Sequence, residues 1–213
     1  MIALALALAA LAATPGERAF TFEAQRLPPQ VRERVVGVSW REGCPVPLRT
    51  LRYLEVAHRG FDGRGRVGEL IVHRDAVPAM RRAFGRLFRK RFPIRRMRLV
   101  DDYGASDFES IEADNTSAFN CRTVAGTDRW SEHAYGRAID INPVENPYVQ
   151  AGSVDPPEGR RYAALDRSAG ARVPPGVVVA GDVVVQAVAD VGWTWGGTWS
   201  SSKDYQHFSL SGR

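Results

Sequence analysis

The chain has 213 residues, of which 44% are hydrophobic and 25% are charged. This length and composition exclude a disordered chain and a coiled coil, and they fit one globular domain with a sizeable core. The formal net charge of +5 arises from 29 basic and 24 acidic residues. A surplus of this size permits an anionic partner but does not by itself indicate a nucleic-acid-binding protein.

The first residues differ in composition from the rest. Residues 1–13 are apolar and uncharged, and the run is shorter than the ~20 residues that a helix needs to span a bilayer. With Ala10-Leu11-Ala12 as the cleavage site, it is typical of a secretory signal peptide, although the usual basic start is missing. We therefore predict a leader over residues 1–15 and a secreted protein without an integral membrane span.

A hairpin followed by a helix is predicted for the middle of the chain. Residues 51–57 alternate as in a strand, residues 60–68 are rich in glycine and predict a turn, and residues 69–73 predict the partner strand. Asp75 is the predicted N-cap of a helix whose apolar residues recur on one face until Pro93 ends it.

The second half of the chain is expected to be less regular. Residues 105–130 are polar and predict a long loop, and prolines between residues 143 and 175 indicate a second irregular stretch. Short elements lie around these loops: strands at 97–100, 138–142 and 193–195, and a helix at 182–191. This irregular order predicts an α+β fold, a single domain with a small antiparallel sheet and flanking helices.

The densest positive charge is a run of arginines between Arg81 and Arg98. It fits an anionic partner, such as a cell-wall polymer or nucleic acid, or the solvated face of a helix. We favour the helix face and predict no nucleic-acid partner, because no aromatic stacking platform of the kind that binds nucleic acid accompanies the run.

Cys44 and Cys121 are the two cysteines of the chain. They lack the CxxC spacing of a cysteine zinc site, and an exported protein can form a disulfide. A disulfide is the preferred interpretation, ahead of two buried thiols and of Cys121 as a nucleophile.

Two short segments in the C-terminal half carry residues suited to catalysis. Residues 131–140 read Ser-Glu-His-Ala-Tyr-Gly-Arg-Ala-Ile-Asp, and residues 204–208 read Asp-Tyr-Gln-His-Phe. His133, Asp140 and His207 offer two imidazoles and a carboxylate, a ligand set of the type found in catalytic zinc sites. Zinc lowers the pKa of a bound water to about 7, so that it can attack at neutral pH.

A general base must lie beside such a water. Asp204 precedes His207 by three residues, close enough to share its turn, and is the candidate base, whereas Glu132 is expected to point away from the site. Judged by spacing alone, His133 and His207 are more often structural histidines held by hydrogen bonds than metal ligands.

The combined pattern changes this balance. Ser-x-His-x-x-Gly-x-Ala-x-Asp is followed by Trp-x-Trp-Gly-Gly-x-Trp and by Asp-Tyr-x-His-Phe. Together these motifs resemble the zinc peptidases of bacterial cell walls, the D-alanyl-D-alanine carboxypeptidases and L-alanyl-D-glutamate endopeptidases, which share a fold with the hedgehog signalling domain. The resemblance runs from about residue 44 to residue 208. It implies an N-terminal extension over residues 16–43 and a zinc peptidase domain with the hedgehog/DD-peptidase-like fold over residues 44–213.

The resemblance implies a role for each matching residue. Zn²⁺ is expected to bind to His133, Asp140 and His207, with Asp204 as the general base. Ser131 matches a serine that contacts the substrate in relatives.

One segment departs from the family pattern. Many relatives have a Ser-Gly-Tyr-Arg segment whose arginine polarises the scissile carbonyl, but the comparable residues 102–104 here read Asp-Tyr-Gly. Arg122 is the candidate replacement, since an arginine there would stabilise negative charge on the tetrahedral intermediate. The alternative is a surface or disulfide-loop arginine.

The expected function is a secreted zinc metallopeptidase that hydrolyses amide bonds in peptidoglycan stem peptides by means of a zinc-activated water. Both the D-alanyl-D-alanine carboxypeptidase and the L-alanyl-D-glutamate endopeptidase reactions fit. The alternative is a non-catalytic zinc-containing module for cell-wall binding or signalling, which would be expected to lack a ligand or the base. The oligomeric state stays open.

Overall fold

The computed structural model describes residues 19–212, and the leader predicted for residues 1–15 lies outside this range. Its longest strands form a hairpin, β2 (Leu51–Arg59) and β3 (Gly65–His73), and β1 (Phe22–Gln25) pairs with β2 on the other side. This antiparallel sheet has the order β1-β2-β3, so β3 is an edge strand. The predicted hairpin is confirmed, although β3 begins four residues earlier than expected.

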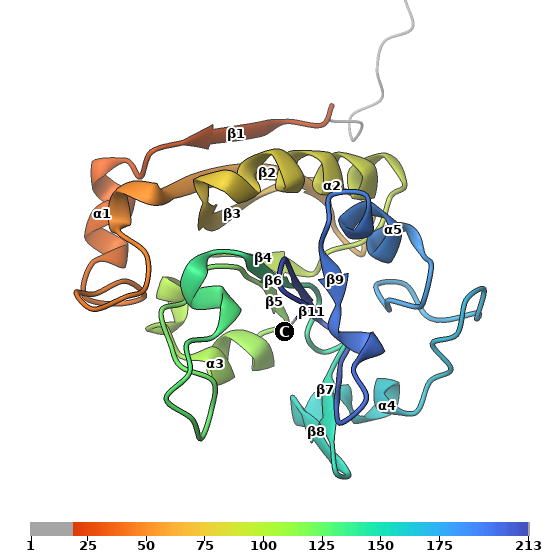
Figure 1. Ribbon diagram of the computed structural model, residues 1–213. Coiled ribbons are helices and arrows are strands. Elements are labelled where there is room, and N and C mark those ends of the chain that lie inside the picture. The colour runs from red at the N-terminus through yellow and green to blue at the C-terminus, as the bar shows by residue number, and fades with distance from the viewer. Residues whose placement is uncertain (1–18, 213) are drawn as a thin grey trace, which may run out of the picture.

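Helices cover both faces of this sheet. α2 (Val77–Arg89) buries Met80, Phe84 and Leu87 in the core on one face, and Figure 1 shows it lying along the hairpin. α1 (Pro29–Val35), Phe119 and Cys121 contribute to a second apolar cluster on the other face. Alternate side chains of β2 and β3 therefore enter two cores.

A smaller antiparallel sheet of order β6-β11-β9 lies at the centre of the molecule (Figure 1). It consists of β6 (Ala138–Asp140), β11 (His207–Ser209) and β9 (Thr194–Trp195), and its register pairs His207 with Asp140. α5 (Val183–Ala189) packs against α2 at one side, after Asp182 as its N-cap. This sheet places two of the expected ligands opposite each other.

The remaining elements are short. β10 (Lys203–Asp204), β7 (Tyr148–Gln150) and β8 (Ser153–Asp155) form a third antiparallel sheet. The last elements are the parallel pair β4 (Arg96–Met97) and β5 (Asn115–Thr116), and the helices α3 (Asp107–Glu112) and α4 (Arg160–Ala163). The α+β prediction is confirmed. Among residues 19–212, no helix is both long and apolar enough to cross a bilayer.

The predicted N-cap of α2 is wrong. Asp75 lies in a 3₁₀ turn, Arg74–Ala76, that precedes the helix, and its carboxylate accepts a hydrogen bond from Arg137 at 3.2 Å. The N-cap position is occupied by Ala76, which offers no capping side chain.

The predicted loop at residues 105–130 contains a helix. α3 begins after Ser106, whose Oγ accepts a hydrogen bond from the N–H of Glu109 at 3.2 Å. Ser-x-x-Glu is a capping-box pattern, and it is the local signal that indicates this helix within a polar stretch.

Cys44 and Cys121 form a disulfide with their Cα atoms 5.9 Å apart, in agreement with the preferred interpretation. The bond joins the segment after α1 to the residues that follow β5, and Cys121 is buried.

Candidate metal centre

His133, Asp140 and His207 converge on one buried point. His133 Nε2 lies 3.2 Å from Asp140 Oδ2 and 3.2 Å from His207 Nδ1, and His207 Nδ1 lies 3.1 Å from Asp140 Oδ1. A tetrahedral zinc ion with bonds of about 2.0–2.1 Å holds its ligand atoms about 3.3 Å apart. The donor atoms and their separations therefore fit zinc.

His133 is oriented by two hydrogen bonds. It lies in the 3₁₀ turn η4 (Glu132–Tyr135), where Ser131 Oγ accepts a hydrogen bond from the His133 N–H at 3.3 Å. Its Nδ1 lies 2.5 Å from the carbonyl oxygen of Ala118. A proton on Nδ1 donates to this carbonyl, and Nε2 is directed at Asp140 and His207.

Gly136 lets the chain turn from His133 into β6. Its φ of 64° lies in the left-handed region, and its carbonyl oxygen accepts a hydrogen bond from the N–H of His73 at 2.9 Å. A Cβ at this position would lie 2.5 Å from the backbone nitrogen of His73. The turn therefore requires glycine both for its conformation and for its contact with β3.

Asp140 remains ionised although it is buried. Burial by itself raises the pKa of a carboxyl, but attraction to His133 and hydrogen bonds with both histidines outweigh it, so the Asp140 pKa lies well below its usual range. A buried anionic carboxylate between two imidazoles is chemically suited to a divalent cation.

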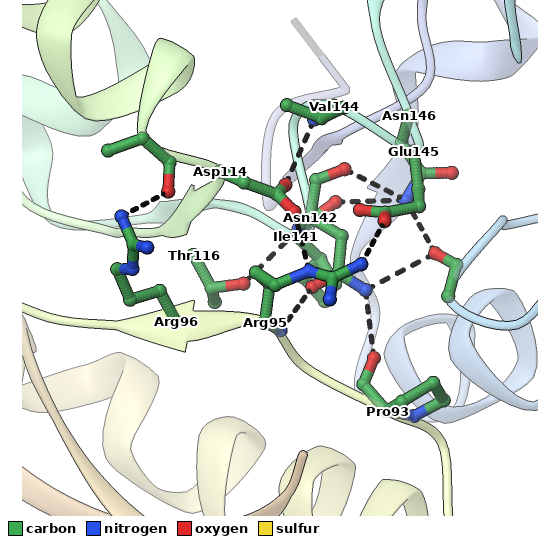
Figure 2. A network of polar contacts seen from close by, with 12 residues as sticks. Pro93, Arg95, Arg96, Asp114, Thr116, Ile141, Asn142, Val144, Glu145 and Asn146 are labelled. Carbon is green, nitrogen blue, oxygen red and sulfur yellow. Dashed lines mark hydrogen bonds and ion pairs between the residues drawn. The ribbon is translucent and has the colours of Figure 1, made fainter. Parts of the chain in front are cut away.

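A buried amide network holds the chain just after Asp140 (Figure 2). Asn142 Oδ1 accepts a hydrogen bond from the Arg95 N–H at 3.0 Å, and its Nδ2 donates to the Pro93 carbonyl at 2.8 Å. The Asn142 N–H donates to Thr116 Oγ1 at 3.2 Å. These bonds fix the end of β6 and hence the position of the Asp140 side chain.

Asp204 lies beside the three ligands, on a strand separate from that of His207 and not in one turn with it. Gly196 permits this approach, because a Cβ there would lie 2.6 Å from the Asp204 carbonyl oxygen. Burial raises the pKa of Asp204 to about 7, partly offset by attraction to His207. Its Oδ1 is shielded from solvent and has no hydrogen-bond partner within residues 19–212. A carboxyl of this kind can accept and return a proton near neutral pH.

Arg122 is held by an acidic residue that the sequence analysis missed. Its Nη2 lies 2.7 Å from Asp107 Oδ2, at the start of α3. The charge of Asp107 also contributes to the raised pKa of Asp204. The Arg122 carbonyl accepts a hydrogen bond from the Ser131 N–H at 3.1 Å, so the backbones of the two candidate substrate-contacting residues are joined.

The aromatic residues near the motif have different surroundings. The Trp199 and His207 ring centroids are 5.5 Å apart, so Trp199 flanks one ligand. Trp195 is buried, and its Nε1 donates to the Tyr205 carbonyl at 2.8 Å. Tyr135 packs against the second apolar cluster. Tyr205 packs against the core that α2 covers, and the guanidinium of Arg167 lies 4.0 Å from its ring centroid. Of these four residues, Trp199 is the one whose ring contacts a ligand.

Comparison with known proteins gives one result. Residues 125–210 match the family model described as D-alanyl-D-alanine carboxypeptidase. The matched segment contains the three converging residues and Asp204, but not Arg122. No curated protein and no solved structure matches the chain. The segment that carries the candidate centre, residues 125–210, is thus similar to the D-alanyl-D-alanine carboxypeptidase family.

Proposed function

We propose that the protein is a zinc-dependent peptidase that hydrolyses an amide bond in stem peptides of the bacterial cell wall, outside the cytoplasm. The observation that carries this proposal is the convergence of His133, Asp140 and His207 with the buried carboxyl of Asp204 beside them. The family match supports a peptide substrate, and the disulfide is typical of an oxidising compartment.

His133, Asp140 and His207 would hold the zinc ion, and three protein ligands are the number typical of catalytic zinc sites. A bound zinc ion would supply Lewis acidity and lower the pKa of a coordinated water. The protein supplies the orientation, because the Ala118 carbonyl fixes the tautomer of His133 and the β6–β11 register sets Asp140 opposite His207.

Asp204 acts as the general base. Its carboxyl, with a pKa of about 7, accepts a proton from the attacking water and returns it to the leaving amine. Arg122, oriented by Asp107, stabilises the negative charge that develops on the scissile carbonyl oxygen. Ser131 caps the turn of His133 and contacts the substrate beside it.

The bond between two D-alanine residues is the favoured target, because the matched family carries that name. The experiment is digestion of purified peptidoglycan by the zinc-loaded protein, with mass spectrometry of the products. Released D-alanine would establish the carboxypeptidase, and new termini at L-alanine and D-glutamate would establish the endopeptidase. Intact peptidoglycan in the presence of bound zinc would refute the peptidase and leave the non-catalytic module.

A further inference from the structure

The arginine run that the sequence analysis assigned to a helix face is divided by the fold. Its first half lies on α2, but its second half follows the helix and lines an open groove of about 690 Å³ at the edge of β3. Gly68 and Met97 lie at the floor of this groove. Its basic lining residues are Arg66, Arg95, Arg96 and Arg98.

β3 has unused backbone groups along this groove. The carbonyl of Ile71 and the N–H of His73 bond outward, to Phe119 and Gly136, so odd-numbered residues of β3 direct their backbone groups away from β2. By the same alternation, Val67 and Glu69 direct their backbone N–H and carbonyl groups into the groove. No strand of residues 19–212 other than β2 pairs with β3. A strand edge of this kind can pair with an extended peptide.

Two of the arginines are already neutralised. Arg66 forms a two-fold ion pair with Asp62, at 2.6 and 2.9 Å, and Arg95 lies 2.8 Å from Glu145 and 3.3 Å from Asp114. These contacts hold the two guanidinium groups in place at the groove wall.

Arg96 and Arg98 are exposed and form no ion pair within the described part of the chain. Arg96 donates to the carbonyl of Ala113 at 2.9 Å, which orients it (Figure 2). The acidic residues of the groove, Glu69 and Asp102, are both bridged by Arg34, at 3.0 and 2.8 Å. The groove therefore has a surplus of positive charge.

We infer that this groove binds an extended acidic polypeptide segment, which adds as a strand to the free edge of β3 and places its carboxylates against Arg96 and Arg98. The backbone groups at Val67 and Glu69 favour a peptide over other polyanions, because a polyphosphate or a nucleic acid cannot continue the ladder of a sheet. Arginine forks match carboxylates in geometry. Val67 is 50% exposed and can pack against alternate apolar side chains of the partner strand.

The first test measures binding of a fluorescent peptide of alternating Glu and Val at low salt, by anisotropy. Arg96→Ala/Arg98→Ala should weaken binding by about tenfold or more, with a strong dependence on salt. The matched control is Arg82→Ala/Arg89→Ala, which removes the same charge from the exposed face of α2 and should leave affinity unchanged. Equal weakening by both pairs, or no binding of the peptide to the unmodified protein, would overturn the inference.

The second test isolates the strand edge. Val67→Pro removes the backbone N–H that faces the groove and leaves the hydrogen bonds between β2 and β3 intact. Val67→Thr is the control, because it keeps this N–H. We expect weaker binding in the proline variant alone, and the same loss when alternate amides of the peptide are N-methylated. If Val67→Pro does not fold, the affinity of the N-methylated peptide for the unmodified protein tests strand addition by itself. Polyphosphate that binds as tightly as the peptide, together with no effect of methylation, would show a simple anion site and refute strand addition.

Discussion

Asp204 is half-buried, with its Oδ1 shielded from solvent and a second carboxylate nearby, a position that raises its pKa to about 7. Asp204→Asn keeps the shape of the side chain but removes the proton acceptor. We expect it to lower kcat by about 10²–10⁴ and to leave zinc content unchanged. Asp128→Asn, at an exposed position, is the matched control for turnover. Full turnover in Asp204→Asn would disprove the assigned base.

Glu145 is a buried carboxyl group that also has a raised pKa. Burial raises the Glu145 pKa from 4.5 to about 7, and a hydrogen bond with Asp114 and repulsion by its charge add to the rise. The hydrogen bond and charge of Arg95 oppose it. Between these values the unfolded chain has released the proton while the folded chain retains it, so the contribution of Glu145 to stability falls as the pH rises through this window. Above pH 7, the ionised Glu145 lowers the free energy of unfolding by up to about 3 kcal/mol.

Glu145→Gln should therefore flatten the pH dependence of stability. We expect the variant to gain about 1–3 kcal/mol over the unmodified protein at pH 8 and much less at pH 5, measured by urea unfolding. Glu33→Gln, at an exposed position, should show no such difference. A variant whose free energy of unfolding keeps the original pH dependence would show that Glu145 is ionised in the folded protein at neutral pH.

At the scale of elements, residue patterns predict those elements whose apolar residues recur at a regular period. The β2–β3 hairpin and α2 follow from alternation and helical periodicity, and α5 from its apolar residues between Asp182 and Gly192. α3 was missed because its six residues carry little apolar periodicity and only its cap marks it. The Arg122–Asp107 pair was missed for the same reason, since it depends on where α3 lies.

The site itself was predicted by resemblance and not by spacing. The spacing of His133 and His207 does not reveal that their strands and turns meet, because the β6–β11 register depends on contacts 67 residues apart. The basic groove could not be predicted at all, since it exists only where β3 and β4 come together.

The turn between His133 and β6 is an element that glycine alone can form. Gly136→Ala places a Cβ 2.5 Å from the nitrogen of His73, in addition to the left-handed φ. We expect a loss well above the roughly 1–2 kcal/mol of the conformation alone, together with weaker zinc binding. Gly104→Ala is the matched control, since it has a φ of 60° and no atom within 4 Å of the added Cβ. Similar losses in both variants would exclude the contact with β3 as the cause.

At the scale of the whole molecule, the disulfide joins the segment after α1 to the residues after β5, across 77 residues. Closing a loop of this length in the unfolded chain accounts for up to about 4.5 kcal/mol of stability in the chain-entropy description. We expect Cys44→Ser/Cys121→Ser to lower the free energy of unfolding by about 2–4 kcal/mol. Reduction of the unmodified protein should have the same effect. Two titratable thiols in the denatured, unreduced protein would contradict the bond.

The most direct test of the metal centre is the zinc content of the folded protein after extensive dialysis, measured by mass spectrometry of the metal. We predict about one zinc ion per chain in the unmodified protein and in His58→Ala, whose imidazole lies outside the cluster. His207→Ala should lose the zinc while it retains the far-ultraviolet circular dichroism of the unmodified protein. A protein without zinc, or a folded His207→Ala variant that keeps it, would contradict the centre formed by His133, Asp140 and His207.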